Sequence, residues 1–170
     1  MTELTDYHQA QLNRRRLLIS LSLLVGGLCS SCVSLPATSP PKILFVCQAG
    51  TAKSAIAREI FRQRAEERGI AVEVISRGIV VEDHVSPKLK QQLRADGIDT
   101  TTKRAMTLQP TDWATANILV NFNPLPSAVV HEDVRDWSDL PSVNDNYPNA
   151  RAILDKRIDA LLTEIANKKK

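Results

Sequence analysis

The fold is decided by the stretch Ile43-Leu44-Phe45-Val46-Cys47-Gln48-Ala49-Gly50-Thr51-Ala52-Lys53-Ser54. Its first four residues are apolar and typical of a buried strand, whereas the residues from Ser54 onward have the pattern of a helix. A loop of small residues between a strand and a helix places backbone N–H groups at the helix N-terminus, where fixed partial charges attract an anion. Because Cys47 opens this loop, the stretch predicts a site that holds an oxyanion beside a nucleophilic thiol.

The side chains of the loop support this interpretation. Helix N-termini and neighbouring cations favour the thiolate over the thiol; Lys53 supplies a cation, and the Ser54 hydroxyl can donate to the sulfur. Gly50 can adopt a left-handed conformation that turns the N–H groups of the loop inward. A lone cysteine is more often a core residue at the end of a buried strand, but the whole octet favours a site. The expected anion-binding residues are Gln48, Ala49, Gly50, Thr51, Ala52, Lys53 and Ser54.

The segments that follow the loop predict a parallel sheet. Residues 54–68 place apolar side chains on one helical face, and Gly69 ends this helix. Residues 71–78 are rich in β-branched side chains and indicate a second strand. A strand, a helix and a strand in this order form a right-handed parallel crossover. Cys47 is therefore expected at the carboxyl end of its strand, where open α/β sheets bind their ligands.

Signals later in the chain complete a domain over residues 42–168. Ser86-Pro87 is typical of a helix start, and Gly97 closes that helix. The remaining expected elements are a short helix capped by Thr111-Asp112 and running to Ala116, strands at 117–122 and 128–130, and a final helix at 149–167. The predicted fold class is α/β, a three-layer α/β/α arrangement with a central parallel sheet of about four strands.

Residues 1–32 are predicted to be an export signal. Three arginines at 14–16 precede an apolar run at 17–28 that is too short to span a bilayer comfortably. The arginines resemble those of a twin-arginine signal, and Cys32 is a candidate lipid-attachment site of a lipoprotein. An uncleaved N-terminal anchor helix is the alternative. We expect an exported protein, either periplasmic or attached to the outer side of the cytoplasmic membrane, with the proline-rich residues 33–41 as a linker.

Composition and spacing argue against several classes of partner. The 170 residues carry a formal net charge of +3, and no basic stripe is interleaved with aromatic residues, so nucleic-acid binding is not expected. His8, His84 and His131 are isolated from one another and from the cysteines, so no metal site is expected, and His84 and His131 are interpreted as polar loop groups. No cofactor is expected.

The run ILFVCQAGTAKSAIARE at residues 43–59 resembles the phosphate-binding loop of the low-molecular-weight protein tyrosine phosphatases and of the arsenate reductases that share their fold. The resemblance extends over residues 42–165. It includes Ser76-Arg77-Gly78, similar to the Ser-Ala-Gly after the second strand of the family, and Gly97-Ile98-Asp99, similar to its Gly-Ile-Asp turn. In that family the loop carries arginine where this chain has Lys53.

The resemblance implies a two-step phosphoryl transfer on a phosphorylated protein, a small aryl phosphate or another oxyanion. The Cys47 thiolate would attack phosphorus, the N–H groups of residues 48–54 would stabilise the equatorial oxygens, and a carboxylic acid would protonate the leaving oxygen. In the family this acid is an aspartate directly before a proline. Here Leu140 holds that position, so Asp139 is the first candidate and Asp136 the second, with solvated loop carboxylates as the alternative reading.

Two further expectations concern the surroundings of the thiol. Trp137 is a candidate to flank an aryl substrate, although a single tryptophan is more often a packing residue. Lys53 keeps a positive charge but lacks the planar fork that grips two oxygens, and the loss of one such contact is expected to lower turnover by about 10²- to 10³-fold.

The replacement of arginine by Lys53 keeps two alternatives to a phosphatase open. One is an arsenate reductase-like enzyme; because no cysteine follows Cys47, it would use an external thiol, with Cys32 as a remote partner. The other is a non-catalytic, exported oxyanion-binding domain.

Overall fold

The computed structural model describes residues 39–168. The predicted export segment and most of the predicted linker lie outside these residues. In the described part of the chain, no helix is long and apolar enough to cross a membrane.

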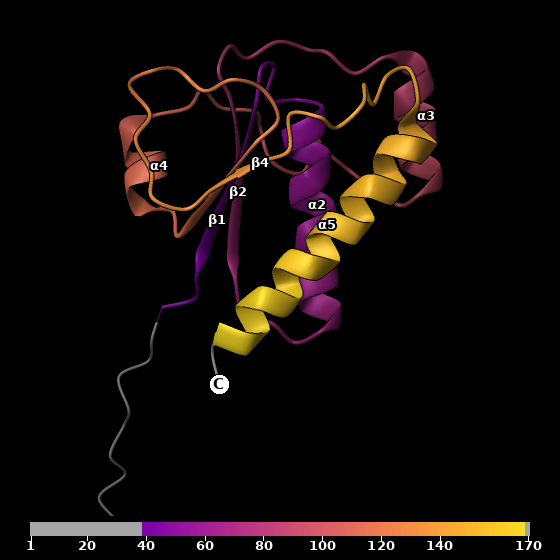
Figure 1. Cartoon of the computed structure of the whole chain (residues 1–170). Coiled ribbons are helices and arrows are strands. Elements are labelled where there is room, and N and C mark those ends of the chain that lie inside the picture. The colour runs from indigo at the N-terminus through magenta and orange to yellow at the C-terminus, as the bar shows by residue number, and fades with distance from the viewer. Residues whose placement is uncertain (1–38, 169–170) are drawn as a thin grey trace, which may run out of the picture. The chain divides into compact units, whose positions relative to one another are not determined.

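The observed elements follow the predicted alternation of strands and helices (Figure 1). They are β1 (Lys42–Cys47), α2 (Lys53–Glu67), β2 (Glu73–Gly78), α3 (Pro87–Ala95), α4 (Pro110–Thr115), β3 (Ile118–Asn121), β4 (Val134–Asp136) and α5 (Tyr147–Lys168). All four strands are parallel and lie in the order β2-β1-β3-β4. The predicted α/β class and the sheet of four parallel strands are confirmed.

The sheet lies between two apolar clusters, and alternate residues of β1 contribute to one or the other. Ile43 and Phe45 pack with α2, α3 and α5, and Figure 1 shows these three helices on one side of the sheet. Leu44 and Val46 face the opposite cluster, which includes Trp113 of α4. Near-continuous apolar runs such as Ile43–Val46 are typical of parallel strands covered on both faces. Helices cover both faces of this sheet, as the predicted three-layer arrangement requires.

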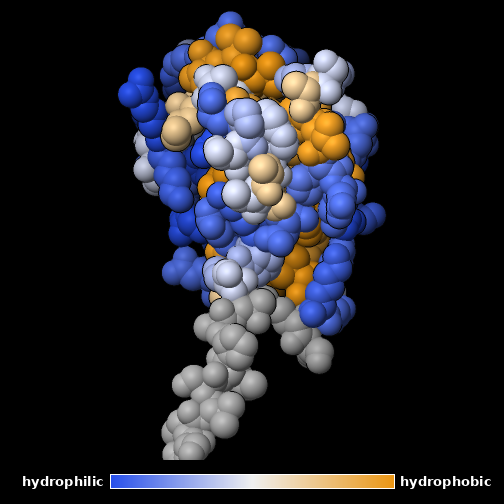
Figure 2. Space-filling view, turned by 90° about the vertical axis from the view of Figure 1, so that its left-hand side faces the viewer, coloured by the Kyte–Doolittle hydropathy of each residue, from blue (hydrophilic) through white to orange (hydrophobic). Residues whose placement is uncertain are grey.

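The strand register brings the functional end of the sheet together. Cys47 pairs with Gly78 of β2, and the preceding residue of β1 pairs with Asn121 of β3. Asn121 in turn pairs with Asp136 of β4. The carboxyl ends of all four strands therefore lie along one edge, and Figure 2 shows apolar residues gathered at the corresponding upper end of the molecule, above a largely hydrophilic face.

Local end signals locate most helix boundaries. The Ser86 side chain accepts a hydrogen bond of 3.2 Å from the Leu89 N–H and so caps α3. Gly69 and Gly97 follow their helices with φ values of +63° and +68°, which is the left-handed geometry expected of glycine at a helix end. The predicted start of α4 was wrong by two positions, because Gln109 and not Thr111 is the N-cap, and Asp112 lies in the first turn, where its carboxylate accepts the Gln109 N–H.

The predicted strand at 128–130 was wrong, since these residues form a turn and an irregular segment. The fourth strand is β4, whose side chains are exposed or half-buried. Its central residue, Arg135, pairs with Asp133 and Glu164. A short edge strand with a charged central residue carries no apolar alternation, so the usual strand signal is missing.

Candidate active site

The Cys47 loop is pressed against the end of β2 through two glycines. Gly50 has φ of +73°, and a Cβ atom placed on it would lie 2.8 Å from the backbone nitrogen of Gly78. A Cβ atom on Gly78 would in turn lie 2.9 Å from the backbone nitrogen of Gly50. The predicted left-handed Gly50 is confirmed, and Gly78 is needed for a separate reason, the close approach of two backbones.

The thiol of Cys47 is only 4% exposed and has two polar neighbours within the loop and helix. The Gly50 N–H donates to Sγ over 3.2 Å, and the Ser54 hydroxyl oxygen lies 3.0 Å from Sγ. Ser54 Oγ also lies 3.3 Å from the carbonyl oxygen of Arg77. The single hydroxyl proton can therefore point to that carbonyl when the sulfur carries its own proton, and to the sulfur when it does not.

The backbone N–H groups of the loop are divided between two tasks. That of Gln48 donates to Asn123 Oδ1 over 3.0 Å, so it anchors the loop to the segment after β3. Those of Thr51, Ala52 and Lys53 donate to no protein atom within residues 39–168. Free N–H groups at the start of α2 are the donors that an anion requires. The structure thus leaves the later predicted donors available and engages Gln48 elsewhere.

Lys53 turns toward the segment that follows β4. Its Nζ donates a 2.6 Å hydrogen bond to the carbonyl oxygen of Leu140. Burial lowers the pKa of Lys53, while the nearby negative charges of Cys47 and Asp139 act in the opposite direction. An ammonium group has three donors, so Lys53 can meet an anion over the loop while one proton remains on Leu140.

The two candidate acids are held in their charged forms. Asp139 is exposed and accepts hydrogen bonds from the two terminal guanidinium nitrogens of Arg157, which hold the pKa of Asp139 below its usual range. Asp136 accepts the Ser138 N–H over 2.9 Å, the main cause of its lowered pKa, and also the side-chain amide of Asn121 over 3.0 Å. A general acid must carry a proton at working pH, and neither carboxyl group lines the cavity at Cys47.

Trp137 lies in the core, with 9% of its surface exposed. Its ring centroid is 6.0 Å from that of Phe45 and 5.9 Å from that of Phe122, and the Arg157 guanidinium lies 5.7 Å from it. The structure therefore places this ring as a packing element and does not place it against the cavity at Cys47.

A cavity of about 290 Å³ opens above the thiol. Besides the loop it is lined by Glu82, His84, Asn123, Ser142, Val143 and Asn144. Apart from His84, which was interpreted as a polar loop group, sequence reasoning did not single out these residues. They come from three loops at the carboxyl edge of the sheet, and only the topology brings them together. We name this space the Cys47 cavity.

Side-chain hydrogen bonds hold the walls of the Cys47 cavity in place. Thr51 Oγ1 donates to the carbonyl oxygen of Glu82 over 2.6 Å and accepts the His84 N–H over 3.1 Å. The side chain of Asn144 donates to the carbonyl oxygen of His84 and accepts the Ser86 N–H. The wall formed by residues 82–84 is thus fixed to the Cys47 loop on one side and to residue 144 on the other.

Comparisons with known proteins agree with this geometry. The sequence profile described as "Low molecular weight phosphotyrosine protein phosphatase" matches residues 42–170. No curated protein matches the sequence. Among solved structures, YfkJ from Bacillus subtilis aligns with a TM-score of 0.67 at 18% identity, over 79% of this chain and 99% of that one.

Two further structures align over similar spans. An arsenate reductase in its phosphate-binding state has a TM-score of 0.60 and 17% identity, over 74% of this chain and 98% of its own. A low molecular weight protein tyrosine phosphatase from Bacillus subtilis has the same TM-score and identity, over 76% of this chain and 99% of its own. At these identities the structures show a shared fold. The family profile spans nearly the whole described part of the chain, so this protein belongs to the low molecular weight phosphotyrosine protein phosphatase family.

Proposed function

We propose that the protein is a cysteine-dependent phosphatase that transfers the phosphoryl group of an aryl phosphate, such as phosphotyrosine, to Cys47. The observation that carries the proposal is the setting of the sulfur, 3.2 Å from the Gly50 nitrogen and 3.0 Å from Ser54 Oγ, at the floor of the Cys47 cavity. Donors aimed at sulfur stabilise it as an anion, which is the nucleophilic form of cysteine.

The proposed reaction has two steps. In the first, the sulfur–phosphorus bond forms as the phosphorus–oxygen bond to the aryl group breaks, and the aryl oxide leaves. The free N–H groups at the start of α2 and the Lys53 ammonium stabilise the charge on the three equatorial oxygens. In the second, water attacks phosphorus, inorganic phosphate leaves, and the Ser54 hydroxyl donates to the sulfur as it recovers its negative charge.

The surroundings of the leaving oxygen favour aryl over alkyl phosphates. Asp139 and Asp136 are both held as carboxylates by their partners, so neither candidate acid brings a proton to the leaving oxygen. Without an acid, the barrier depends on how well the departing oxygen bears negative charge by itself. Phenolates bear it far better than alkoxides.

Hydrolysis by the purified full chain tests this proposal. We expect p-nitrophenyl phosphate to be hydrolysed faster than phenyl phosphate by at least about tenfold. The reason is that p-nitrophenolate is the better leaving group, and neither candidate acid donates a proton that would reduce this difference in rate. We expect Cys47→Ser to abolish both activities. Equal rates for wild type and Cys47→Ser would show that the activity does not come from this site.

One observation favours a second candidate function, an oxyanion-binding domain without turnover. The Lys53 ammonium, the only cationic side chain lining the Cys47 cavity among the described residues, is bonded to Leu140. Phosphate, sulfate and arsenate are the natural probes, since any anion that binds the folded protein raises its melting temperature. Stabilisation by these anions without hydrolysis of either aryl phosphate would support the binder.

Arsenate reduction is less well supported by the residues at hand. The chain has no cysteine after Cys47, so the oxidised product would be resolved by a thiol from outside the domain. Arsenate-dependent oxidation of an added small thiol, measured beside the hydrolysis assay, distinguishes this reaction from phosphatase activity.

We also propose that the protein is exported and attached to the membrane through its N-terminal segment. The support is the pattern of arginines at 14–16, the apolar run at 17–28 and Cys32. Cell fractionation of the full chain tests the proposal. Changing Arg14 and Arg15 to lysine should retain the protein in the cytoplasm, and Cys32→Ser should release it from the membrane fraction.

A further inference from the structure

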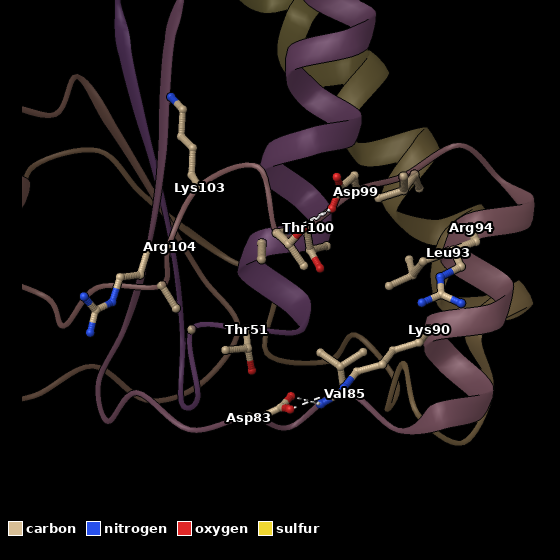
Figure 3. Close-up of a pocket in the computed structure, with 15 residues that line it drawn as sticks. Thr51, Asp83, Val85, Lys90, Leu93, Arg94, Asp99, Thr100, Lys103 and Arg104 are labelled. Atoms are coloured by element: carbon tan, nitrogen blue, oxygen red, sulfur yellow. Dashed lines mark hydrogen bonds and ion pairs between the residues drawn. The ribbon is translucent and has the colours of Figure 1, made fainter.

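A second cavity of about 490 Å³ lies beside the Cys47 loop (Figure 3). It is lined by residues of α3, by Asp83 and Val85, and by residues 98–101 and 103–105, together with Gly50, Thr51 and Ala55. Within the described chain, no residue lines both this cavity and the Cys47 cavity. We name this space the α3 cavity.

One strip of backbone separates the two cavities. Glu82 and His84 line the Cys47 cavity, whereas Asp83 and Val85 line the α3 cavity. The strip is fixed by the two hydrogen bonds of Thr51 to residues 82 and 84. The α3 cavity is therefore a separate compartment with a firm wall, although it touches the loop that carries Cys47.

The inner surface of the α3 cavity is apolar and belongs to the core. Ala55, Leu93 and Ile98 are each at most 4% exposed and contribute to it. Side chains packed in a core hold their positions without a ligand. The cavity is thus preformed, and its volume lies within the range of about 300–1,000 Å³ that is usual for small-molecule sites.

Arg94 brings an unpaired positive charge to this apolar surface. Its guanidinium reaches from α3 toward the middle of the cavity in Figure 3. It makes no hydrogen bond or ion pair with any other residue in 39–168. The neighbouring Lys90, by contrast, is paired with Asp83 over 3.3 Å.

The other charged groups around the cavity do not neutralise Arg94. The Asp99 carboxylate accepts the N–H and hydroxyl of Thr101 over 2.8 and 2.6 Å. Lys103 and Arg104 also line the cavity but point away from its middle in Figure 3. Since Lys90 is paired with Asp83 and the Asp99 carboxylate is engaged by Thr101, Arg94 is the cation that these neighbours leave available to a bound anion.

We propose that the α3 cavity binds a small organic anion with an apolar body. The anionic group, a carboxylate, sulfonate or phosphate, pairs with the guanidinium of Arg94, which grips two oxygens at once. The apolar body lies on Leu93 and Ile98. This inference is independent of the proposed phosphatase activity, because binding is measured without turnover.

The probe for the test is 8-anilinonaphthalene-1-sulfonate, which joins a sulfonate to an aromatic body and fluoresces when it enters an apolar site. We expect the full chain to bind one equivalent. Arg94→Glu should weaken binding by about tenfold or more, because a charge-assisted contact is lost and a repulsive charge is added. Lys88→Glu, the same charge reversal on α3 but outside the cavity lining, should leave the affinity within about twofold.

Two filling variants decide which cavity holds the probe. Ala105→Phe places a ring in the α3 cavity and should abolish binding, whereas Ser142→Phe places one in the Cys47 cavity and should leave the affinity within about threefold. Melting temperatures measured without the probe verify that each variant is folded. Equal weakening by Arg94→Glu and Lys88→Glu, or loss of binding in Ser142→Phe alone, would overturn the proposal.

Discussion

The ammonium group of Lys53 donates a 2.6 Å hydrogen bond to the carbonyl oxygen of Leu140. This contact joins the start of α2 to the segment between β4 and α5. Both residues stand at places where the sequence departs from the phosphatase pattern that it otherwise resembles, one in the loop and one at the expected acid. The departures therefore meet in space, and the hydrogen bond between them ties the start of α2 to the segment after β4.

The first prediction concerns this tie. Lys53→Arg should raise kcat/KM for p-nitrophenyl phosphate by about tenfold or more, because the guanidinium fork binds two equatorial oxygens at once. Lys53→Met removes the charge and the tie together, so kcat/KM and the melting temperature should both fall. Steady-state kinetics and thermal unfolding of the three proteins measure these effects.

The matched comparison for these variants is Lys90→Met, which removes an exposed cation paired with Asp83 away from the thiol. It should leave kcat/KM within about twofold, as is usual for a surface ion pair. If Lys53→Arg binds phosphate more tightly but hydrolyses nothing, the oxyanion-binding function takes the place of the phosphatase.

Local sequence signals were sufficient for the parts of the fold that local chemistry determines. The buried strand before Cys47, the crossover to β2 and the caps at Ser86, Gly69 and Gly97 each follow from a few adjacent residues. By contrast, β4 could not be found, because its three residues show no apolar alternation and its central residue, Arg135, is half-buried through an ion pair with the distant Glu164.

The site itself was predictable only in its nucleophilic half. Cys47, Gly50 and Ser54 are close in sequence, so their geometry follows from the loop. The far wall comes from loops that only the sheet topology brings together, and no local pattern marks Asn123 as the acceptor of the Gln48 N–H. The contacts of Asp139 with Arg157 and of Lys53 with Leu140 could not be predicted for the same reason.

The second prediction concerns the candidate acids. Asp139→Asn and Asp136→Asn should each change kcat/KM for phenyl phosphate by less than about threefold, whereas loss of a true general acid costs about 10²-fold or more. The reason is that both pKa values lie below the usual range, Asp139 through Arg157 and Asp136 through the Ser138 N–H. Above pH 5 both groups are already deprotonated, so the pH profile of kcat/KM should show no descending limb from either. A fall of a hundredfold in one variant would identify that residue as the acid.

The third prediction concerns the contact between the loop and β2. Gly78→Ala should destabilise the protein by about 1–3 kcal/mol, as overpacking does, because its Cβ atom would lie 2.9 Å from the Gly50 nitrogen. The displaced loop should also lose the contact from Gly50 to the sulfur, so activity should fall further than stability explains. Denaturant unfolding and the alkylation rate of Cys47 measure the two effects.

Gly69→Ala provides the control for that variant. A Cβ atom there meets nothing within 4 Å, and only the positive φ of +63° resists it. We expect a cost of about 1 kcal/mol from the backbone conformation alone and an unchanged alkylation rate. Equal alkylation rates in Gly78→Ala and wild type would mean that the loop holds its shape without the glycine contact.

The fourth prediction concerns Glu59, a carboxylate of α2 that is 2% exposed. Burial acts to raise its pKa, but hydrogen bonds from Arg58, Arg62 and Thr102 outweigh burial and leave the pKa below the ordinary value of 4.5. A carboxyl group with a lowered pKa in the folded state stabilises the fold above its unfolded pKa. This stabilisation is lost as the pH falls below about 4.5 and through the folded-state value.

Glu59→Gln should therefore lower the free energy of unfolding at pH 7 by about 3 kcal/mol, because it leaves the buried guanidinium of Arg58 without its counter-charge. It should also flatten the loss of stability between pH 5 and pH 3. Glu66→Gln is the matched control, since its side chain is 77% exposed and also pairs with Arg62, and it should cost less than about 0.5 kcal/mol. Denaturant unfolding at several pH values compares the two variants. Parallel pH profiles for Glu59→Gln and wild type would show that the acid sensitivity of the fold arises from other carboxyl groups.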